Sequence, residues 1–455
     1  MTGHSTDSTP TAERIPRTAE AAAVAAPSPA VRRKVTLATA IGNFVEWFDS
    51  GAYAIMSATI AGLFFPQYDK TAALLATWAV FAGGFIARPA GAVFFGRYGD
   101  RIGRNRMLAL SVLCMSGSTL LIGLLPSYAT IGVAAPVLLF LLRAVQGFST
   151  GGEYTGASAF IMEYAPEGRR ARYASVVALT VGLASVAGSL TGLLITWSMD
   201  DASLRSWGWR IPFLLAGPLG LIGLYLRSRI EDTPVFRAME RREAVLHAPI
   251  RDAWRLCRRQ VLTLFGYSIT NAVGYYLMSS YLIAYMSEEV GYSKTEAMLT
   301  GFVSMLAYSA ACPLMAAASD RWGRKPMLLT ACTGFAVCTL PAFWLIGTSL
   351  AGALVGATVL AVFVAVIGTS NVPAMVEMFP AQLRASGSAL GYTAAYVLFG
   401  GTAPFVATGL VTVAGTPLAP GFYLMALAVV SALVVHFSFR ETKQLSLART
   451  TVIDG

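Results

Sequence analysis

The length of its uncharged stretches constrains this chain more than any other feature. Residues 327–376 contain no Asp, Glu, Lys or Arg, and neither do residues 385–439. A helix needs about 20 predominantly apolar residues to cross the ~30 Å hydrocarbon core of a bilayer. Each run therefore predicts two membrane helices joined by a turn, near Gly347–Ser349 in the first run and Ala414–Gly421 in the second. Barrel strands would alternate in polarity, so helices are favoured.

The rest of the chain has the same character. Of its 455 residues, 55% are hydrophobic and 13% are charged, against about 25% charged in ordinary soluble domains. We therefore expect an all-α integral membrane protein with twelve transmembrane helices. The expected spans are 36–62, 71–96, 107–125, 131–160, 173–198, 210–227, 260–286, 297–318, 327–346, 351–378, 385–412 and 421–439.

The positive charge of the chain indicates its orientation. The net charge is +10, which in a soluble protein would suggest a nucleic-acid partner, but its placement argues against one. With the N-terminus inside, four of the 34 Lys and Arg residues lie in external loops, two lie within spans, and the others are cytoplasmic. This positive-inside bias predicts a cell-membrane protein with both termini in the cytoplasm. The external four are Lys70, Arg205, Arg210 and Lys294.

Two pairs of similar loop segments indicate an internal duplication. Gly99–Met107 (GDRIGRNRM) is echoed by Ser319–Met327 (SDRWGRKPM), and Glu163–Ser175 is echoed by Glu377–Ala389. Repeats half a chain apart predict two six-helix halves around one central site. The expected units are a disordered cytoplasmic tail (1–35), an N-terminal bundle (36–228), a basic cytoplasmic linker (229–259), a C-terminal bundle (260–440) and a short cytoplasmic tail (441–455).

Longer motifs resemble a known family. Gly42–Tyr53 (GNFVEWFDSGAY), Ile86–Arg104, Arg143–Arg170 and Trp207–Phe236 are similar to segments of the metabolite:proton symporter family of the major facilitator superfamily. The resemblance covers about residues 36–440. It implies the major facilitator fold and proton-coupled uptake by alternating access.

The resemblance leaves the substrate open. The motifs look closest to proline and glycine betaine carriers, which implies a small zwitterionic osmolyte. The runner-up is a di- or tricarboxylate such as citrate, 2-oxoglutarate or shikimate, because Arg88 and Arg143 can clamp carboxylates. A proton-driven exporter and a non-transporting membrane sensor are further alternatives.

Four charges are expected in one layer near mid-membrane. Glu46 and Asp49 lie in the first span, Arg88 in the second and Arg143 in the fourth. A charge at the centre of a membrane helix costs about 2.5–3.5 kcal/mol on insertion scales. Four charges at this depth therefore indicate a role that offsets this cost. Glu46 and Asp49, three residues apart, share a helix face. We expect at least one acid to carry the coupled proton, and a static ion-pair network is the alternative.

Other candidates surround this layer. Glu153 is a third proton-coupling candidate, although the glycines beside it could serve helix packing alone. Gln146 lies one turn from Arg143 and could line the same cavity. In the C-terminal half the best candidates are Asn271, Tyr275 and Tyr276, because an amide can bind a carboxylate and a ring face can hold a quaternary ammonium. Packing is the alternative role for these three.

The loop motifs predict latches between helices. An Asp at a helix end can cap a helix N-terminus, and an Arg there can pair with an acid on a neighbouring helix. Such pairs would close one face of the bundle and break when the halves rock; the alternative is a basic anchor at the lipid headgroups. The candidate latch residues are Asp100, Arg101, Gly103, Arg104, Glu163, Arg169, Arg170, Asp320, Arg321, Arg324, Glu377 and Arg384.

No pattern suggests an enzyme or a cofactor. The five cysteines and three histidines show no metal-ligand or disulfide spacing, and no catalytic triad or nucleotide loop is present. We expect no metal and no cofactor. The expected partners are a small substrate, protons and the lipid bilayer, with no nucleic acid, and the protein is expected to act as a monomer.

Overall fold

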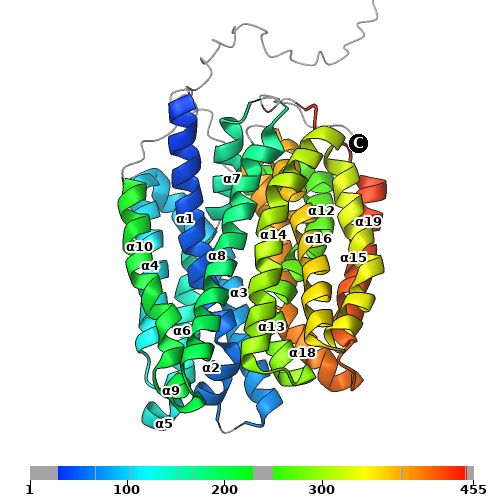
Figure 1. The fold of residues 1–455 in the computed structure, drawn as a ribbon. Coiled ribbons are helices and arrows are strands. Elements are labelled where there is room, and N and C mark those ends of the chain that lie inside the picture. The colour runs from blue at the N-terminus through cyan, green and yellow to red at the C-terminus, as the bar shows by residue number, and fades with distance from the viewer. Residues whose placement is uncertain are drawn as a thin grey trace, which may run out of the picture.

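The computed structural model describes residues 29–66, 68–102, 104–151, 153–166, 168–228, 249–380, 383–445 and 447. Helices make up nearly all of these ranges, and no strand occurs within them. The long helices lie side by side, roughly along one direction (Figure 1). We call the end where α1 begins and α19 ends the termini end, and the opposite end, which carries α5 and α9, the far end.

The first group of helices precedes residue 229. Its members are α1 (Pro29–Ile55), α2 (Ser57–Phe64), α3 (Lys70–Ile102), α4 (Arg104–Leu124), α5 (Tyr128–Ile131), α6 (Ala134–Ser149), α7 (Glu153–Glu163), α8 (Arg170–Ser198), α9 (Asp201–Ser206), the 3₁₀ turn η1 (Gly208–Arg210) and α10 (Ile211–Ser228).

The second group follows residue 248 and contains three π-helical segments. Its members are α12 (Pro249–Tyr276), η2 (Leu277–Tyr281, π), α13 (Leu282–Tyr285), η3 (Met286–Val290, π), α14 (Lys294–Trp322), α15 (Arg324–Ile346), α16 (Leu350–Glu377), α17 (Arg384–Ala395), η4 (Tyr396–Gly400, π), α18 (Ala403–Ala414) and α19 (Ala419–Ser438).

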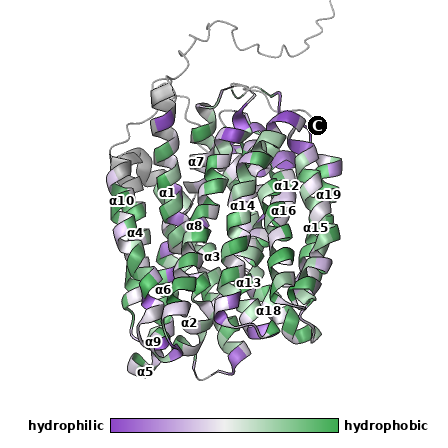
Figure 2. Ribbon diagram, in the orientation of Figure 1, coloured by the Kyte–Doolittle hydropathy of each residue, from purple (hydrophilic) through white to green (hydrophobic). Residues whose placement is uncertain are grey.

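The helical membrane fold is confirmed. Every expected span coincides with one helix or with consecutive helices, and seven described stretches are by themselves long and apolar enough to cross a membrane. Both expected turns are present, one between α15 and α16 and one between α18 and α19. Hydrophilic residues gather toward the two ends of the bundle in Figure 2, as a membrane protein requires.

The expected boundaries differ from the structure in three places. The first span is broken at Met56, between α1 and α2, and the fourth is divided among α5, α6 and α7. The disordered tail expected over 1–35 is too long, because α1 begins at Pro29. Residues 1–28 lie outside the described part of the chain.

The last part of the basic linker expected over 229–259 is helical. Helix α12 begins at Pro249, and residues 229–248 lie outside the described part of the chain. Ala253, Cys257 and Val261, spaced four apart, are buried, whereas most residues between them are exposed. The basic residues of this segment therefore lie on the outer face of an amphipathic helix that kinks at Cys257.

Helices α8 and α14 pack along each other where the two groups meet (Figure 1). Gly182 of α8 makes this contact close, because a Cβ there would lie 2.5 Å from Cδ1 of Tyr308 and from Oγ of Ser309 on α14. The Tyr308 hydroxyl also donates to the Ala178 carbonyl across the same contact (3.2 Å). A glycine therefore sets the spacing of the two groups at their centre.

Candidate functional site

Aromatic side chains from both groups of helices meet at the centre of the molecule. We call them the central aromatic cluster. Its members are Trp47 (α1), Phe81 and Phe85 (α3), Tyr154 (α7), Tyr275 and Tyr276 (α12), Tyr308 (α14), Tyr392 (α17) and Tyr396 (η4).

Trp47 links the two groups. Its ring centroid lies 5.2 Å from that of Tyr275 and 6.0 Å from that of Tyr154, both edge-on, and it stacks with Tyr276 at 6.3 Å. Tyr276 also meets Phe85 edge-on at 5.2 Å. Such distances are typical of favourable aromatic pairs, so the cluster is continuous across the boundary between the groups.

A second run of rings extends the cluster through the second group. Tyr154 stacks on Tyr392 with centroids 4.9 Å apart, and Tyr392 stacks on Tyr396 at 4.1 Å. Tyr396 in turn lies 6.1 Å from Tyr276. The rings of α1, α7, α12 and α17 therefore pack against one another at the centre.

Three of the four charges expected in one layer lie around this cluster. Glu46 is 4% exposed and lies within electrostatic range of Tyr154 and Tyr276. Arg88 and Arg143 lie over Phe85 and Phe81, the rings that contact Tyr276. The structure thus brings Glu46, Arg88 and Arg143 to a common neighbour. The side chain of Asp49, the fourth member, lies outside the described residues.

Both arginines are held against aromatic rings. The Arg88 guanidinium lies 4.1 Å above the ring of Phe85, and that of Arg143 lies 4.5 Å above Tyr53 and 5.0 Å above Phe81. Cation–π contacts of this kind are stronger where water is excluded. The rings therefore help to keep two positive charges at this depth.

Arg143 also begins a hydrogen-bond chain. Its Nη1 donates to Oε1 of Gln146, and Nε2 of Gln146 donates to the Thr119 hydroxyl at 2.8 Å. All three side chains are buried. Gln146 thus contacts Arg143 and links it by hydrogen bonds to Thr119 of α4.

The candidates of the second group point in different directions. Asn271 donates from Nδ2 to the Tyr396 hydroxyl (2.9 Å), within its own group of helices. The Tyr275 hydroxyl lies 2.9 Å from Oγ of Ser185 on α8, in the first group. Tyr276 is buried, and its hydroxyl lies beside the Arg88 side chain. Of the three, Tyr276 is the one that meets a charged residue of the first group.

Glycines bring α3 and α6 close together at the level of the arginines. A Cβ on Gly147 would overlap the Gly84 carbonyl, and one on Gly151 would overlap the backbone at Arg88 and Ala92. The close helix approach expected at Gly151 is confirmed. Gly152 and the side chain of Glu153 lie outside the described residues.

Trp47 and Tyr154 were not predicted from the sequence as site residues. Each directly follows a candidate acid, Glu46 or Glu153. A lone aromatic residue in an apolar helix usually serves packing. The signal that could have found these two is their position inside motifs that also carry buried charges.

A buried ion-pair network occupies the termini end of the second group. Arg324 is 1% exposed and donates from Nη2 and Nε to the two oxygens of Glu377, at 3.0 and 3.2 Å. Its Nη1 lies 3.1 Å from Oδ1 of Asp320. A bidentate pair of this kind is among the stronger charged contacts. The structure therefore brings three expected latch residues together.

The same network reaches the first group. The Asp320 carboxylate accepts from the backbone N–H groups of Ala171 and Arg172 at 2.9 and 3.1 Å, so it caps the N-terminus of α8. Nη1 of Arg170 lies 3.6 Å from Glu377. These contacts join α8 to α14 and α16 at the termini end.

The segment after α19 covers this network. The Glu441 carboxylate accepts from the backbone N–H of Arg324 at 2.9 Å, and the Thr442 hydroxyl donates to Glu377 at 2.8 Å. The Leu445 carbonyl accepts from Arg170, and the Leu447 carbonyl accepts from Arg384. Arg384 thus binds backbone carbonyls, including that of Val376 (3.1 Å).

Arg169 and Arg321 are the remaining latch candidates whose side chains the structure describes, and neither belongs to this network. Arg169 and Arg321 are exposed, and the Arg321 carbonyl accepts from Lys443. Gly103 lies outside the described residues, as do the side chains of Asp100, Arg101, Arg104 and Glu163.

Two exposed ion pairs join the groups at the far end. Nζ of Lys70 on α3 lies 2.6 Å from Glu288 of η3. Nζ of Lys294 on α14 lies 2.7 Å from Oδ1 of Asp201 on α9. The charge of Lys294 and the hydrogen bond from it lower the pKa of Asp201. Both ends of the bundle therefore carry contacts between the groups.

Comparisons with known proteins agree with this architecture. Family models described as "Sugar (and other) transporter" and "Major Facilitator Superfamily" match residues 35–251 and 263–451. The proline/betaine transporter of Escherichia coli K12 is 37% identical over 92% of this chain and 85% of its own length. This chain belongs to the major facilitator superfamily, in the family of the proline/betaine transporters.

Other members of this family are similarly close. A glycine betaine/proline/ectoine/pipecolic acid transporter of Dickeya dadantii is 36% identical over 92% of this chain and 85% of its own length. An ectoine/proline transporter of Corynebacterium glutamicum is 34% identical over 89% of this chain and 84% of its own length. The proton:xylose symporter XylE, bound to 6-bromo-6-deoxy-D-glucose, has the same major facilitator fold. Its TM-score is 0.76 at 18% identity, over 92% of this chain and 98% of that one.

Proposed function

We propose that this protein takes up a small zwitterionic osmolyte, such as proline or glycine betaine, together with a proton, by alternating access. The central aromatic cluster carries this proposal. Its rings come from both groups of helices, and Glu46, Arg88 and Arg143 lie around it. A site of this composition suits a ligand that has a cationic apolar end and an anionic end.

The aromatic rings would bind the ammonium end. Trp47 is the best cation–π partner among side chains, and it lies between Tyr154 and Tyr275. The methyl groups of a betaine would contact ring faces without needing a hydrogen-bond donor. Arg88, Arg143 or the Tyr276 hydroxyl would bind the carboxylate, with Asn271, Tyr275 and Gln146 positioning their neighbours.

Glu46 is the proposed proton carrier. It is buried beside Tyr154 and Tyr276, between the two groups of helices. Rocking of the halves would change the surroundings of this carboxylate and release the proton on one side. Asp49 and Glu153 remain proposed as further proton-coupling residues.

We also propose that the contacts at the two ends are the latches of alternating access. Asp320, Arg324 and Glu377 would hold the termini end closed, together with Arg170 and Arg384. By the duplication, Asp100, Arg101, Gly103, Arg104 and Glu163 would act in the first half. Arg169 and Arg321 would act as basic anchors.

The positive charge supports an orientation with the termini end in the cytoplasm. In this proposal the protein lies in the cell membrane, with 36–228 and 260–440 as its two rocking halves. It acts as a monomer on a small substrate. It catalyses no covalent reaction and binds no nucleic acid.

Proton symport of di- or tricarboxylates is the second candidate, and Arg88 and Arg143 favour it. Purified protein in proteoliposomes separates the two. We expect an inward-directed proton gradient to drive uptake of labelled glycine betaine, with unlabelled proline competing and citrate and 2-oxoglutarate failing to compete. Uptake that ignores the proton gradient would refute symport, and competition by citrate alone would support the carboxylate function.

A further inference from the structure

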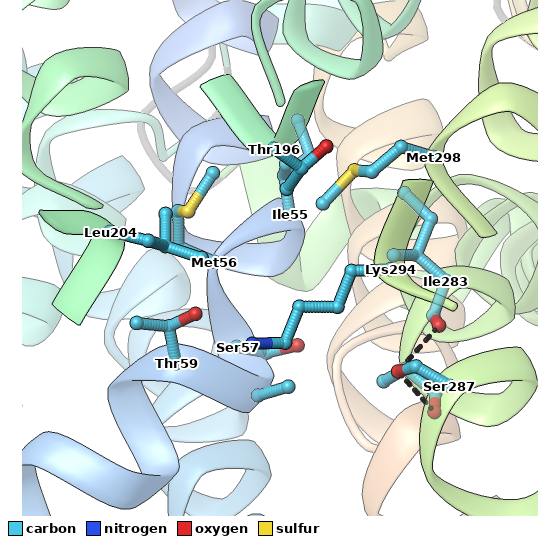
Figure 3. Close-up of a pocket in the computed structure, with 12 residues that line it drawn as sticks. Ile55, Met56, Ser57, Thr59, Thr196, Leu204, Ile283, Ser287, Lys294 and Met298 are labelled. Carbon is cyan, nitrogen blue, oxygen red and sulfur yellow. Dashed lines mark hydrogen bonds between the residues drawn. The ribbon is translucent and has the colours of Figure 1, made fainter. Parts of the chain in front are cut away.

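A pocket lies between the two groups of helices near the far end (Figure 3). It forms where the first span breaks at Met56, and residues of α1, α2, α8 and α9 line it on one side. Residues of α13, η3 and α14 line it on the other side. The pocket therefore borders the path that a solute would take from the far end to the centre.

The pocket contains one cationic side chain. Lys294 extends across it toward Ser57 in Figure 3, and its side chain is 34% exposed. The ammonium is held by Asp201 of α9, whose side chain is 72% exposed. Ion pairs this exposed contribute only about 0–1 kcal/mol, so another carboxylate can replace Asp201 on the lysine.

The other walls are largely apolar. Met56 and Met298 line the pocket together with Ile55 and Ile283, and in the view of Figure 3 the two methionine sulfurs lie on either side of Ile55. Methionine adapts its shape and is polarisable. These walls suit methyl or methylene groups, which lie beside the carboxylate in a small zwitterion.

Two of these wall residues also separate the pocket from the centre. A Cβ on Gly188 of α8 would lie 2.5 Å from Cδ1 of Ile55, and one on Gly192 would lie 2.8 Å from Cγ2 of Ile55 and from the Met298 sulfur. Ile55 lies two turns beyond Trp47 on the same helix, a distance of about 12 Å. Ile55 and Met298 are thus placed between the pocket and the central aromatic cluster.

We propose that this pocket is an outer docking site for the carboxylate of a zwitterionic substrate. The substrate carboxylate replaces Asp201 on Lys294, and its apolar cationic end rests against Met56, Ile283 and Met298. Release of Asp201 removes one contact between the halves. Docking at this site thereby favours opening toward the centre. This inference rests on the proposed function.

Two matched substitutions test the site in proteoliposomes, with glycine betaine as the probe. Lys294→Gln removes the docking charge, and Asp201→Asn removes the same ion pair but frees the lysine. We expect Lys294→Gln to raise KM about three- to tenfold, in the range of a partly exposed charged contact. We expect Asp201→Asn to leave KM unchanged or lower it.

A third variant and a binding measurement complete the test. Lys70→Gln removes the other far-end ion pair without touching the pocket, and we expect it to change KM no more than Asp201→Asn does, because each variant breaks one contact between the halves. Thr59→Cys places a thiol in the pocket wall, and glycine betaine should slow its labelling by a membrane-impermeant maleimide when Lys294 is present. Equal KM changes in the Lys294 and Asp201 variants, or labelling that glycine betaine does not slow, would overturn the inference.

These experiments distinguish failure of the docking site from failure of the proposed function. Slower labelling of Thr59→Cys in the presence of glycine betaine, together with no proton-driven uptake by the wild-type protein, would refute symport and leave the docking site standing. Wild-type-like KM in Lys294→Gln, in vesicles with normal proton-driven uptake, would refute the docking site alone.

Discussion

At the scale of single residues, neighbouring acid and aromatic side chains define the site. The sequence predicted that Glu46, Arg88 and Arg143 share one depth, because depth follows from counting residues along each span. The structure brings them around Tyr276. Trp47 could not be predicted in the same way, because its role depends on rings from α7 and α12 that only folding brings beside it.

Replacing Trp47 tests the aromatic recognition. Trp47→Leu removes a cation–π partner worth about 0.5–2 kcal/mol, so KM for glycine betaine should rise about two- to thirtyfold. Trp47→Phe should restore part of the affinity, because it keeps a ring face. Trp209→Leu removes another buried indole, which packs on Phe64 and Phe213, away from the cluster, and should leave KM unchanged. Initial uptake rates give KM for each variant. Similar KM shifts for Trp47→Leu and Trp209→Leu would count against a substrate site at Trp47.

The pH response of the far end follows from Asp201. Lys294 holds its pKa below the ordinary Asp value of about 3.9. The ion pair is therefore fully present well above about pH 4 and is lost as pH falls through the lowered pKa. Labelling of Thr59→Cys should not change between pH 5 and 8 through this pair. A labelling change in that range that Asp201→Asn abolishes would contradict the assignment.

At the scale of helices, the π-helical segments and the break at Met56 say more about the site than the spans do. Tyr276 ends α12 just before the π-helical segment η2, and Tyr396 begins η4. π-helical turns often occur at functional sites, and both of these residues belong to the central aromatic cluster. The uncharged runs predicted the spans. Nothing in the sequence, however, marks the places where a helix changes from α-helical to π-helical turns. The break at Met56 likewise lies within a continuous apolar run.

The close packing of α3 on α6 makes a stability prediction. A Cβ on Gly147 would overlap the backbone carbonyl of Gly84, which cannot rotate away. Gly147→Ala should therefore destabilise the protein by about 1–3 kcal/mol. Gly117→Ala is the matched control, because nothing lies within 4 Å of its added Cβ. Thermal unfolding midpoints of the purified proteins check this; an unchanged midpoint for Gly147→Ala would show that the helices are not this close.

At the scale of the whole molecule, the contacts at the two ends differ in burial. Arg324 and Glu377 at the termini end have side chains exposed by 1% and 0%, whereas Lys70 at the far end is 77% exposed. The repeated loop motif predicted that Asp320 and Arg324 would bind neighbouring helices. It could not predict that Asp320 caps α8 of the other half, or that Glu441 binds α15, because those partners depend on how the halves dock.

Asp320 offers a test of the termini-end latch. Asp320→Asn removes the negative charge that pairs with Arg324 and lies at the N-terminus of α8. A charge there contributes about 0.3–1 kcal/mol, or up to roughly fivefold in an equilibrium. The termini end should open more often, seen as longer distances between spin labels placed on the two halves at that end. Arg321→Gln is the control, since Arg321 is exposed and its side chain lies outside the network. Equal distance distributions for Asp320→Asn and wild type would refute the latch.

The account as a whole depends on Glu46 coupling a proton to substrate movement through the central aromatic cluster. The most direct measurement compares proton-driven accumulation of glycine betaine with exchange of labelled for unlabelled substrate across vesicles that have no gradient. We predict that Glu46→Gln abolishes accumulation under an imposed proton gradient and keeps exchange, because the amide mimics the protonated acid. Accumulation at the wild-type level in Glu46→Gln would contradict the account.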